Sequence, residues 1–133
     1  MKTDEKKNIV LIVEDEVKML AALSEKFERE GFAVEGAQDG KIGLERALSI
    51  KPDIIVLDIL MPVKDGLTML KELRMANEWG KTVPVVILTN LSADNPETIR
   101  TVAETEPSYY LVKTDWTINQ VVEKVREQLT RHE

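Results

Sequence analysis

Cysteine is absent from the 133 residues, and histidine occurs once, at His132. These absences exclude disulfide bonds, thiolate metal sites and cysteine nucleophiles, and they argue against a histidine-based zinc site or catalytic triad. Aromatic residues make up only 5% of the chain, and the 18 basic residues are outnumbered by 24 acidic ones. Because nucleic acid binds to basic surfaces, the net charge of −6 leads us to expect no nucleic-acid partner.

Long apolar runs are also missing. No segment approaches the roughly 18 consecutive apolar residues that a membrane-spanning helix needs. The charged N-terminal residues do not lead into the apolar core of a signal peptide. We therefore expect no membrane partner and a cytoplasmic location. The length suits one domain, which we place at residues 8–131, after an N-terminal tail at residues 1–7.

Short apolar segments alternate with segments of helical spacing along the whole chain. The short segments are rich in Val and Ile and predict five strands, at Ile9–Val13, Ala33–Ala37, Ile54–Leu57, Val85–Leu88 and Tyr109–Val112. A helical pattern follows each of them. Alternation of this kind predicts an α/β fold, a doubly wound parallel sheet of five strands flanked by five helices.

Each of the five predicted helices has apolar residues on one face, which should meet the sheet. The fourth helix combines Ile99, Val102 and Ala103, and the last helix carries a longer stripe made of Ile118, Val121, Val122, Val125 and Leu129. Residues typical of helix ends support the boundaries: Gly31 after the first helix, Asn95 as an N-cap, and Thr117 with Gln120 as a capping box.

Polar residues follow four of the predicted strands, at the edge where open parallel sheets bind ligands. They are Glu14, Asp15 and Glu16 after the first strand, Asp58 after the third, Thr89 after the fourth and Lys113 after the fifth. Clustered carboxylates repel one another, and oxygen ligands without Cys or His select Mg²⁺, with Mn²⁺ as an alternative. This set would suit a phosphoryl group, with Asp58 as the nucleophile.

Each of these residues has a simpler interpretation when it is taken alone. Glu14 or Asp15 could cap the first helix, Asp58 could be a turn residue, and Lys113 could be a solvated surface lysine. The placement of all of them at the carboxyl ends of strands favours the phosphoryl site.

The motifs resemble those of response-regulator receiver domains of two-component signalling, in their stand-alone, chemotaxis-regulator-like form. The resemblance covers about Asn8 to Leu129, and it is carried by Val13-Glu14-Asp15-Glu16, by Asp58 with Met61-Pro62-Val63-Lys64-Asp65-Gly66, by Thr89, and by Tyr110-Leu111-Val112-Lys113. It implies the flavodoxin-like receiver fold with strand order 2-1-3-4-5.

The resemblance also implies the role of each site residue. Asp58 would accept a phosphoryl group from a sensor histidine kinase or a histidine phosphotransfer protein. Mg²⁺ would be held by Asp15, Asp58 and the backbone carbonyl of Leu60, with Glu14 acting through a metal-bound water. Lys113 and Thr89 would bind the phosphoryl group, and Tyr110 would report it to the face formed by the fourth helix, the fifth strand and the last helix, where an unknown downstream protein docks.

The resemblance implies no enzyme activity beyond self-phosphorylation with Mg²⁺ and autodephosphorylation. Two alternatives stay open: a pseudo-receiver that docks partners without phosphorylation, and a receiver fragment of a larger hybrid protein. The starting methionine favours a stand-alone protein over the fragment. A phosphatase of the haloacid dehalogenase type would need an acid at Leu60, and a flavodoxin-like nucleotide binder would need a Gly- and Ser/Thr-rich loop where Glu14-Asp15-Glu16 stands.

The sequence departs from the family pattern near the site. Thr114 follows Lys113, where the family usually has a cis proline, so we expect a trans bond there. Asn90 replaces a smaller residue. Leu60 and Leu91 occupy positions that tune dephosphorylation in the family, and neither can position a water, so we predict slow autodephosphorylation.

Overall fold

The computed structural model describes residues 7–91 and 96–132 of the chain. Five parallel strands form one sheet in the order β2-β1-β3-β4-β5. Their bounds are β1 Ile9–Val13, β2 Ala33–Ala37, β3 Ile54–Leu57, β4 Val85–Thr89 and β5 Tyr109–Val112. The predicted fold class, strand order and strands are confirmed. β4 is one residue longer than expected, because Thr89 still pairs with Val112 of β5.

The register of the strands brings their carboxyl ends to one edge of the sheet. Val13, the last residue of β1, pairs with Leu57, the last residue of β3. Glu14 and Asp58 therefore leave the sheet side by side, and the backbone N–H of Asp58 donates to the carbonyl of Val13 (3.0 Å). This pairing places residues that are far apart in the sequence at a single point.

Within the described residues, six α-helices and one short 3₁₀ helix connect and cover the strands. Their bounds are α1 Val17–Arg29, α2 Gly40–Ile50, α3 Gly66–Ala76, α4 Glu78–Thr82, α5 Pro96–Thr105, η1 Lys113–Asp115 and α6 Ile118–His132. The structure has one α-helix more than the five that were expected, and the extra one is the short helix α4. Asn77 starts this extra helix, because its side chain accepts a hydrogen bond from the N–H of Gly80 (2.7 Å).

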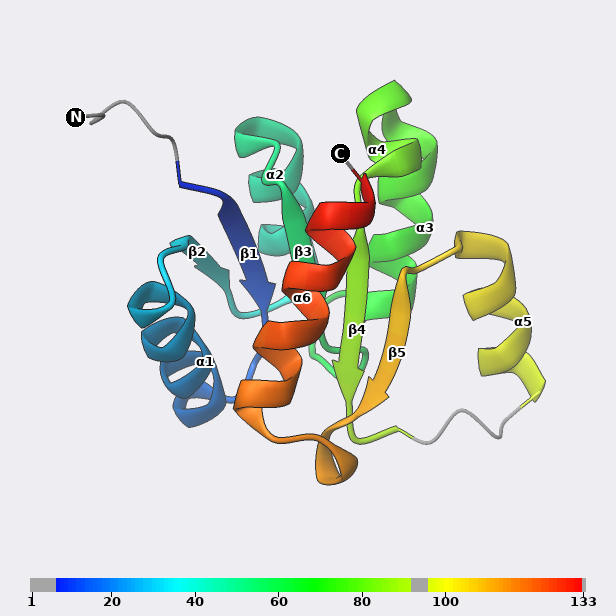
Figure 1. Cartoon of the computed structure of the whole chain (residues 1–133). Coiled ribbons are helices and arrows are strands. Elements are labelled where there is room, and N and C mark those ends of the chain that lie inside the picture. The colour runs from blue at the N-terminus through cyan, green and yellow to red at the C-terminus, as the bar shows by residue number, and fades with distance from the viewer. Residues whose placement is uncertain (1–6, 92–95, 133) are drawn as a thin grey trace.

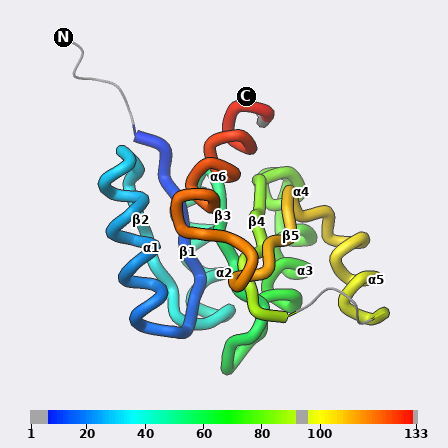
Figure 2. The backbone as a smooth tube through the Cα atoms, turned by 60° about the horizontal axis from the view of Figure 1, so that its bottom comes forward, coloured from blue at the N-terminus to red at the C-terminus, as the bar shows by residue number. Residues whose placement is uncertain are grey.

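Helices cover both faces of the sheet, and each face has its own apolar cluster. Phe27 of α1 and Val125 of α6 belong to one cluster, whereas Ala47 of α2 and Leu70 of α3 belong to the other. Figure 1 shows α6 crossing in front of the strands, and Figures 1 and 2 both place α5 at the margin of the molecule. None of the described helices has the length and apolar character that a membrane crossing requires.

The predicted helix ends are confirmed where the structure describes them. Thr117 and Gln120 exchange hydrogen bonds as a capping box, with the N–H of Thr117 donating to Gln120 Oε1 (2.8 Å) and the N–H of Gln120 donating to Thr117 Oγ1 (3.1 Å). Gly31 follows α1 with a φ of 97°, a conformation that favours glycine. The predicted cap at Asn95 and residues 1–6 of the predicted tail lie outside the described residues.

The predicted inner face of α5 is wrong. Ile99 is 50% exposed and Ala103 is also exposed, although Val102 packs against the apolar cluster on that side of the sheet. The residues of α5 that are buried are three threonines, Thr98, Thr101 and Thr105. The apolar pattern fails here because the helix is turned so that its hydroxyl-bearing side faces the protein.

Candidate functional site

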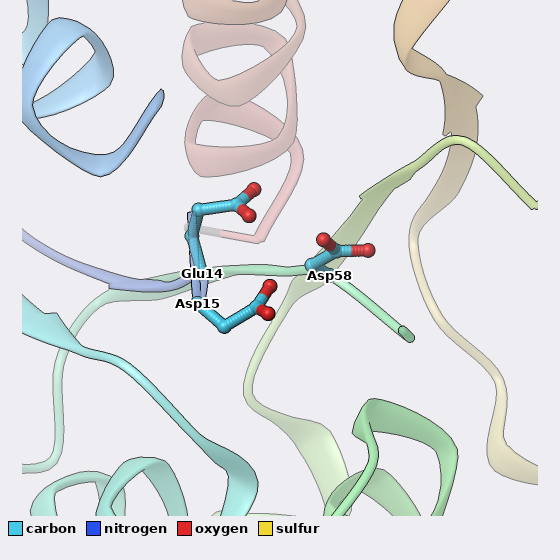
Figure 3. Close-up of side chains that lie close together, drawn as sticks. All are labelled: Glu14, Asp15 and Asp58. Carbon is cyan, nitrogen blue, oxygen red and sulfur yellow. The ribbon is translucent and has the colours of Figure 1, made fainter. Parts of the chain in front are cut away.

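Three carboxylates meet at the carboxyl edge of the sheet. Glu14 and Asp15 follow β1, Asp58 follows β3, and one oxygen atom from each lies within 4.8 Å of the others. Figure 3 shows the three side chains close together, with those of Glu14 and Asp15 directed toward Asp58. Glu14 and Asp58 are buried, with 2% and 5% exposed, whereas Asp15 is exposed. The predicted acidic cluster is therefore brought together, and its open side is at Asp15.

Lys113 is the cation that pairs with both buried carboxylates. Its Nζ lies 2.8 Å from Glu14 Oε1 and 3.1 Å from Asp58 Oδ2. It also lies 3.9 Å from Glu16 Oε1 at the surface. Glu16 is not among the predicted site residues, although its place beside Glu14 and Asp15 in a run of three acidic residues is a usable signal.

Burial and pairing act in opposite directions on the pKa values of this group. Burial raises the pKa of Glu14, although hydrogen bonds from Lys113 and from the N–H of Glu16 oppose this. Burial lowers the pKa of Lys113, but its hydrogen bond with Glu14 and the charge of Asp58 outweigh burial and raise it. Lys113 is therefore held as the ammonium ion between the two carboxylates.

The loop after β3 fixes the backbone around Asp58. The N–H of Leu60 donates to Asp58 Oδ1 (3.2 Å), and the N–H of Gly66 donates to the carbonyl of Ile59 (2.9 Å). A Cβ atom at Gly66 would lie 2.1 Å from the carbonyl oxygen of Asp58, so only glycine allows this close approach. Asp65 then caps α3 by accepting from the N–H of Thr68 (2.8 Å).

Thr89 and Tyr110 form a second group beside the carboxylates. Thr89 is fully buried at the end of β4, and its hydroxyl accepts a hydrogen bond from the N–H of Leu91 (3.3 Å). The hydroxyl of Tyr110, on β5, donates to the carbonyl of Leu91 (2.7 Å). Leu91 therefore connects the two residues that are predicted to form the switch.

A cavity of about 250 Å³ opens over Asp58. Besides the three carboxylates and Glu16, it is lined by Leu60, Asn90 and Lys113. Thr89, Tyr110 and Leu91 are not among the described residues that line it, and Leu91 lines a neighbouring cavity between α3 and α5 instead. Two of the three positions predicted to tune dephosphorylation thus border Asp58 directly.

The segment after β5 aims Lys113 at this cavity. The bond between Lys113 and Thr114 is trans, as predicted from the absence of proline, and Lys113 begins the short helix η1. The N–H of Trp116 closes this turn by donating to the carbonyl of Lys113 (3.4 Å). A single 3₁₀ turn thus holds the lysine in place without a cis bond.

The donor set fits a hard divalent cation. Carboxylate oxygens are the ligands that Mg²⁺ prefers, and Mg²⁺ needs only one or two carboxylates from the protein. Asp15 is exposed and has a place beside Asp58, whereas Lys113 already pairs with Glu14 and Asp58. A carboxylate beside an ammonium group and a cation site is an arrangement that can receive a phosphoryl group.

Known proteins with this fold carry the same arrangement of strands and helices. A receiver domain of a Francisella response regulator is 31% identical, with a TM-score of 0.82 over 96% of this chain and 100% of that one. A receiver domain protein from Methanospirillum hungatei, described as CheY-like, has a TM-score of 0.86 over 96% of this chain and 97% of that chain. At 20% identity, the second similarity concerns the fold alone.

Curated relatives are longer than this chain. The transcriptional regulatory protein PrrA of Mycobacterium leprae is 37% identical over 123 residues, which make up 92% of this chain and 50% of that protein. The chain spans about a third to a half of the length of the curated relatives it matches. The sequence model of the response regulator receiver domain matches residues 10–126. The chain therefore belongs to the response regulator receiver domain family.

Proposed function

We propose that Asp58 is the phosphoacceptor of this receiver domain, which we take to span residues 8–131. The observation that carries the proposal is the contact of Lys113 with both buried carboxylates, 2.8 Å from Glu14 and 3.1 Å from Asp58, beside exposed Asp15. Receiver domains of two-component systems interact with histidine kinases, and the donor here is a sensor histidine kinase or a histidine phosphotransfer protein. The exchange takes place in the cytoplasm.

Each residue has a defined part in the transfer. A carboxylate oxygen of Asp58 forms the new O–P bond as the P–N bond to the donor histidine breaks, and the electron pair of that bond returns to the imidazole. Lys113 stays in place as a cation and pairs with the phosphoryl oxygens. Asp15, Asp58 and the backbone carbonyl of Leu60 would hold Mg²⁺, and Glu14 would act through a water. When bound, the ion neutralises phosphoryl charge.

Phosphorylation of the purified chain by a small phosphodonor tests this assignment. With acetyl phosphate and Mg²⁺, intact-mass spectrometry should show one added phosphoryl group in the wild type. Asp58→Asn should show none, and removal of Mg²⁺ with a chelator should lower the yield at least tenfold. Asp53→Asn is the matched control, because Asp53 lies at the opposite edge of the sheet, where its carboxylate accepts from the N–H of Ile9 (2.7 Å). An added phosphoryl group in Asp58→Asn, or none in the wild type, would contradict the proposal.

The output of the domain passes through Thr89 and Tyr110 to the face formed by α5, β5 and α6. The hydroxyl of Thr89 now accepts from the N–H of Leu91, and the hydroxyl of Tyr110 donates to the carbonyl of the same residue. When Thr89 turns to the phosphoryl group, it gives up the bond to Leu91. The changed face then binds a downstream protein.

The phosphorylated state is long-lived in this protein. Loss of the phosphoryl group needs a water in line with the O–P bond, and a polar side chain that positions it contributes roughly 10²–10⁴-fold in rate. Leu60 lines the cavity over Asp58 and cannot supply this help, and Leu91 is apolar as well. Asn90 adds bulk on the same side.

Decay of the phosphorylated protein in Mg²⁺ measures this lifetime. Leu60→Asn should decay at least several-fold faster than the wild type, because the new amide reaches the cavity. Leu91→Glu should have a smaller effect, since Leu91 lines the neighbouring cavity. Leu48→Met on α2 serves as the control, because it also replaces a leucine by a side chain of similar size but lies away from the site. Equal decay rates in the wild type and in Leu60→Asn would refute the proposed lifetime.

A further inference from the structure

A second cavity, of about 430 Å³, lies at the edge of the sheet opposite to the carboxylates. Pro84 and Ser108 line it and directly precede β4 and β5, whereas Asp58 directly follows β3. Residues of α3, of α4 and of the C-terminal turns of α6 also line it, and Figure 1 shows α4 and the end of α6 at the same end of the molecule. Within the part of the chain that the structure describes, the cavity shares no lining residue with the one over Asp58.

Gln128 of α6 lines this cavity, and it is a polar residue on the apolar face of its helix. It is 8% exposed and follows Val121 and Val125, which pack in the core, at helical spacing. Within residues 7–91 and 96–132, its Nε2 atom has no hydrogen-bond partner. A buried amide without a partner is unfavourable, whereas leucine would fill the same position without this penalty. Rotation of the terminal amide about its last bond would turn the NH₂ group from this buried position toward the cavity.

Positive charge surrounds the cavity although the chain is acidic overall. Among the described residues that line it are three basic side chains, Arg74, Lys81 and Arg131, and one carboxylate, that of Glu106. Lys81 also pairs with Glu78 on the solvent side (3.4 Å). These basic side chains favour an anion, and a phosphate dianion can pair with more than one of them.

The charge of Arg74 is fixed at the cavity by the backbone around it. Its guanidinium group donates to four carbonyl oxygens, those of Thr105 (2.8 Å), Gly80 (2.9 Å), Val83 (2.8 Å) and Glu106 (3.0 Å). Four of its five N–H groups are thereby used, so Arg74 supplies charge and one remaining donor. Lys81 and Arg131 are exposed and can adjust to a ligand.

We propose that this cavity binds phosphate, as the free ion or as a phosphomonoester. The NH₂ group of Gln128 donates to the bound group, and Lys81 and Arg131 neutralise it. The ligand bridges α4 and α6 at the edge of the sheet that faces away from Asp58. Binding there is independent of the carboxylates and of Mg²⁺.

Titration of the isotope-labelled full chain, followed by amide NMR shifts without Mg²⁺, tests the site. Inorganic phosphate and glycerol 3-phosphate are added separately at constant ionic strength. We expect saturable shifts at the amides of Lys81, Ser108 and Gln128. Saturation by either probe supports the site, and the tighter probe identifies the source of the phosphate.

Variants separate a built site from diffuse charge. Gln128→Leu should weaken binding about tenfold, the effect of one lost hydrogen bond to a charged group, while keeping or raising the melting temperature without ligand. Lys81→Ala, at an exposed position, should weaken binding several-fold, and Lys41→Ala on α2 should leave it unchanged. Shifts that never saturate, shifts confined to the loop after Asp58, or equal affinity in the wild type and Gln128→Leu would overturn the proposal.

Discussion

The helices α5 and α6 flank the same strand, β5, but they are held in the protein by different forces. α6 buries Val121, Val122 and Val125, each no more than 1% exposed. α5 leaves Ile99 half exposed and buries threonines instead. The free energy that apolar burial supplies to α6 is largely missing from α5.

A single arginine compensates for part of what α5 lacks. Arg74 of α3 donates to the carbonyls of Thr105 and Glu106, at the C-terminal end of α5 (2.8 and 3.0 Å). The same side chain donates to the carbonyls of Gly80 and Val83, so it ties α5 to α4. Directional hydrogen bonds can therefore fix a helix at one end while its packed face stays polar.

Removal of Arg74 should break the attachment of α5. Arg74→Met keeps the length of the side chain but leaves four backbone carbonyls without their donor. We expect the free energy of unfolding to fall by roughly 3 kcal/mol, which urea denaturation measures. Hydrogen exchange should accelerate most in α5. Arg100→Met, on the exposed side of α5, is the control, and a loss below about 1 kcal/mol in Arg74→Met would show that the arginine does not hold the helix.

Matched truncations in the two helices test the difference in packing directly. Val125→Ala in α6 should lower the free energy of unfolding by about 2 kcal/mol, because it removes buried carbon atoms and leaves a cavity. Ile99→Ala in α5 removes more carbon atoms but should change it by less than about 0.5 kcal/mol, since the side chain is exposed. Thermal or urea unfolding of both variants gives the comparison. Equal losses would mean that α5 packs as firmly as α6.

The smallest effect concerns an ion pair that adds to the packing of α6. Arg126 of α6 donates to the carboxylate of Glu30 (2.8 Å), and this bond, with that of Lys26, lowers the pKa of Glu30. Because the pKa of Glu30 is lower in the folded protein, its carboxylate stabilises the fold at pH values above the ordinary pKa of the group. This contribution is lost as the pH falls through the pKa that Glu30 has in the folded protein. Arg126→Met should therefore make the loss of stability between about pH 5 and about pH 3 slightly shallower.

Unfolding midpoints measured across that pH range check this expectation. Arg29→Met is the control, because Arg29 pairs with Glu25 at a far more exposed position, where little stability is expected from the pair. If the unfolding midpoints of Arg126→Met and of the wild type depend on pH in the same way, the ion pair does not contribute to the attachment of α6.

The sequence by itself determined the strands, their order through the family resemblance, and the identity of the residues at the carboxyl edge. Continuous apolar runs such as Ile54–Leu57 indicate strands buried on both faces, and polar residues that follow them must lie at one edge of a parallel sheet. These conclusions depend on local pattern and on topology, which sequence expresses well.

The tertiary structure alone decided the features that depend on partners distant in the sequence. The orientation of α5 that exposes Ile99 could not be predicted from the sequence. An amphipathic pattern shows only which helix face is the most apolar. It does not show hydrogen bonds from a distant residue such as Arg74. Gln128 was hidden for the same reason, since its burial follows from the position of α6 against β4 and β5. The packing of elements that are distant in the sequence, rather than periodicity along the chain, decides how far these residues are buried.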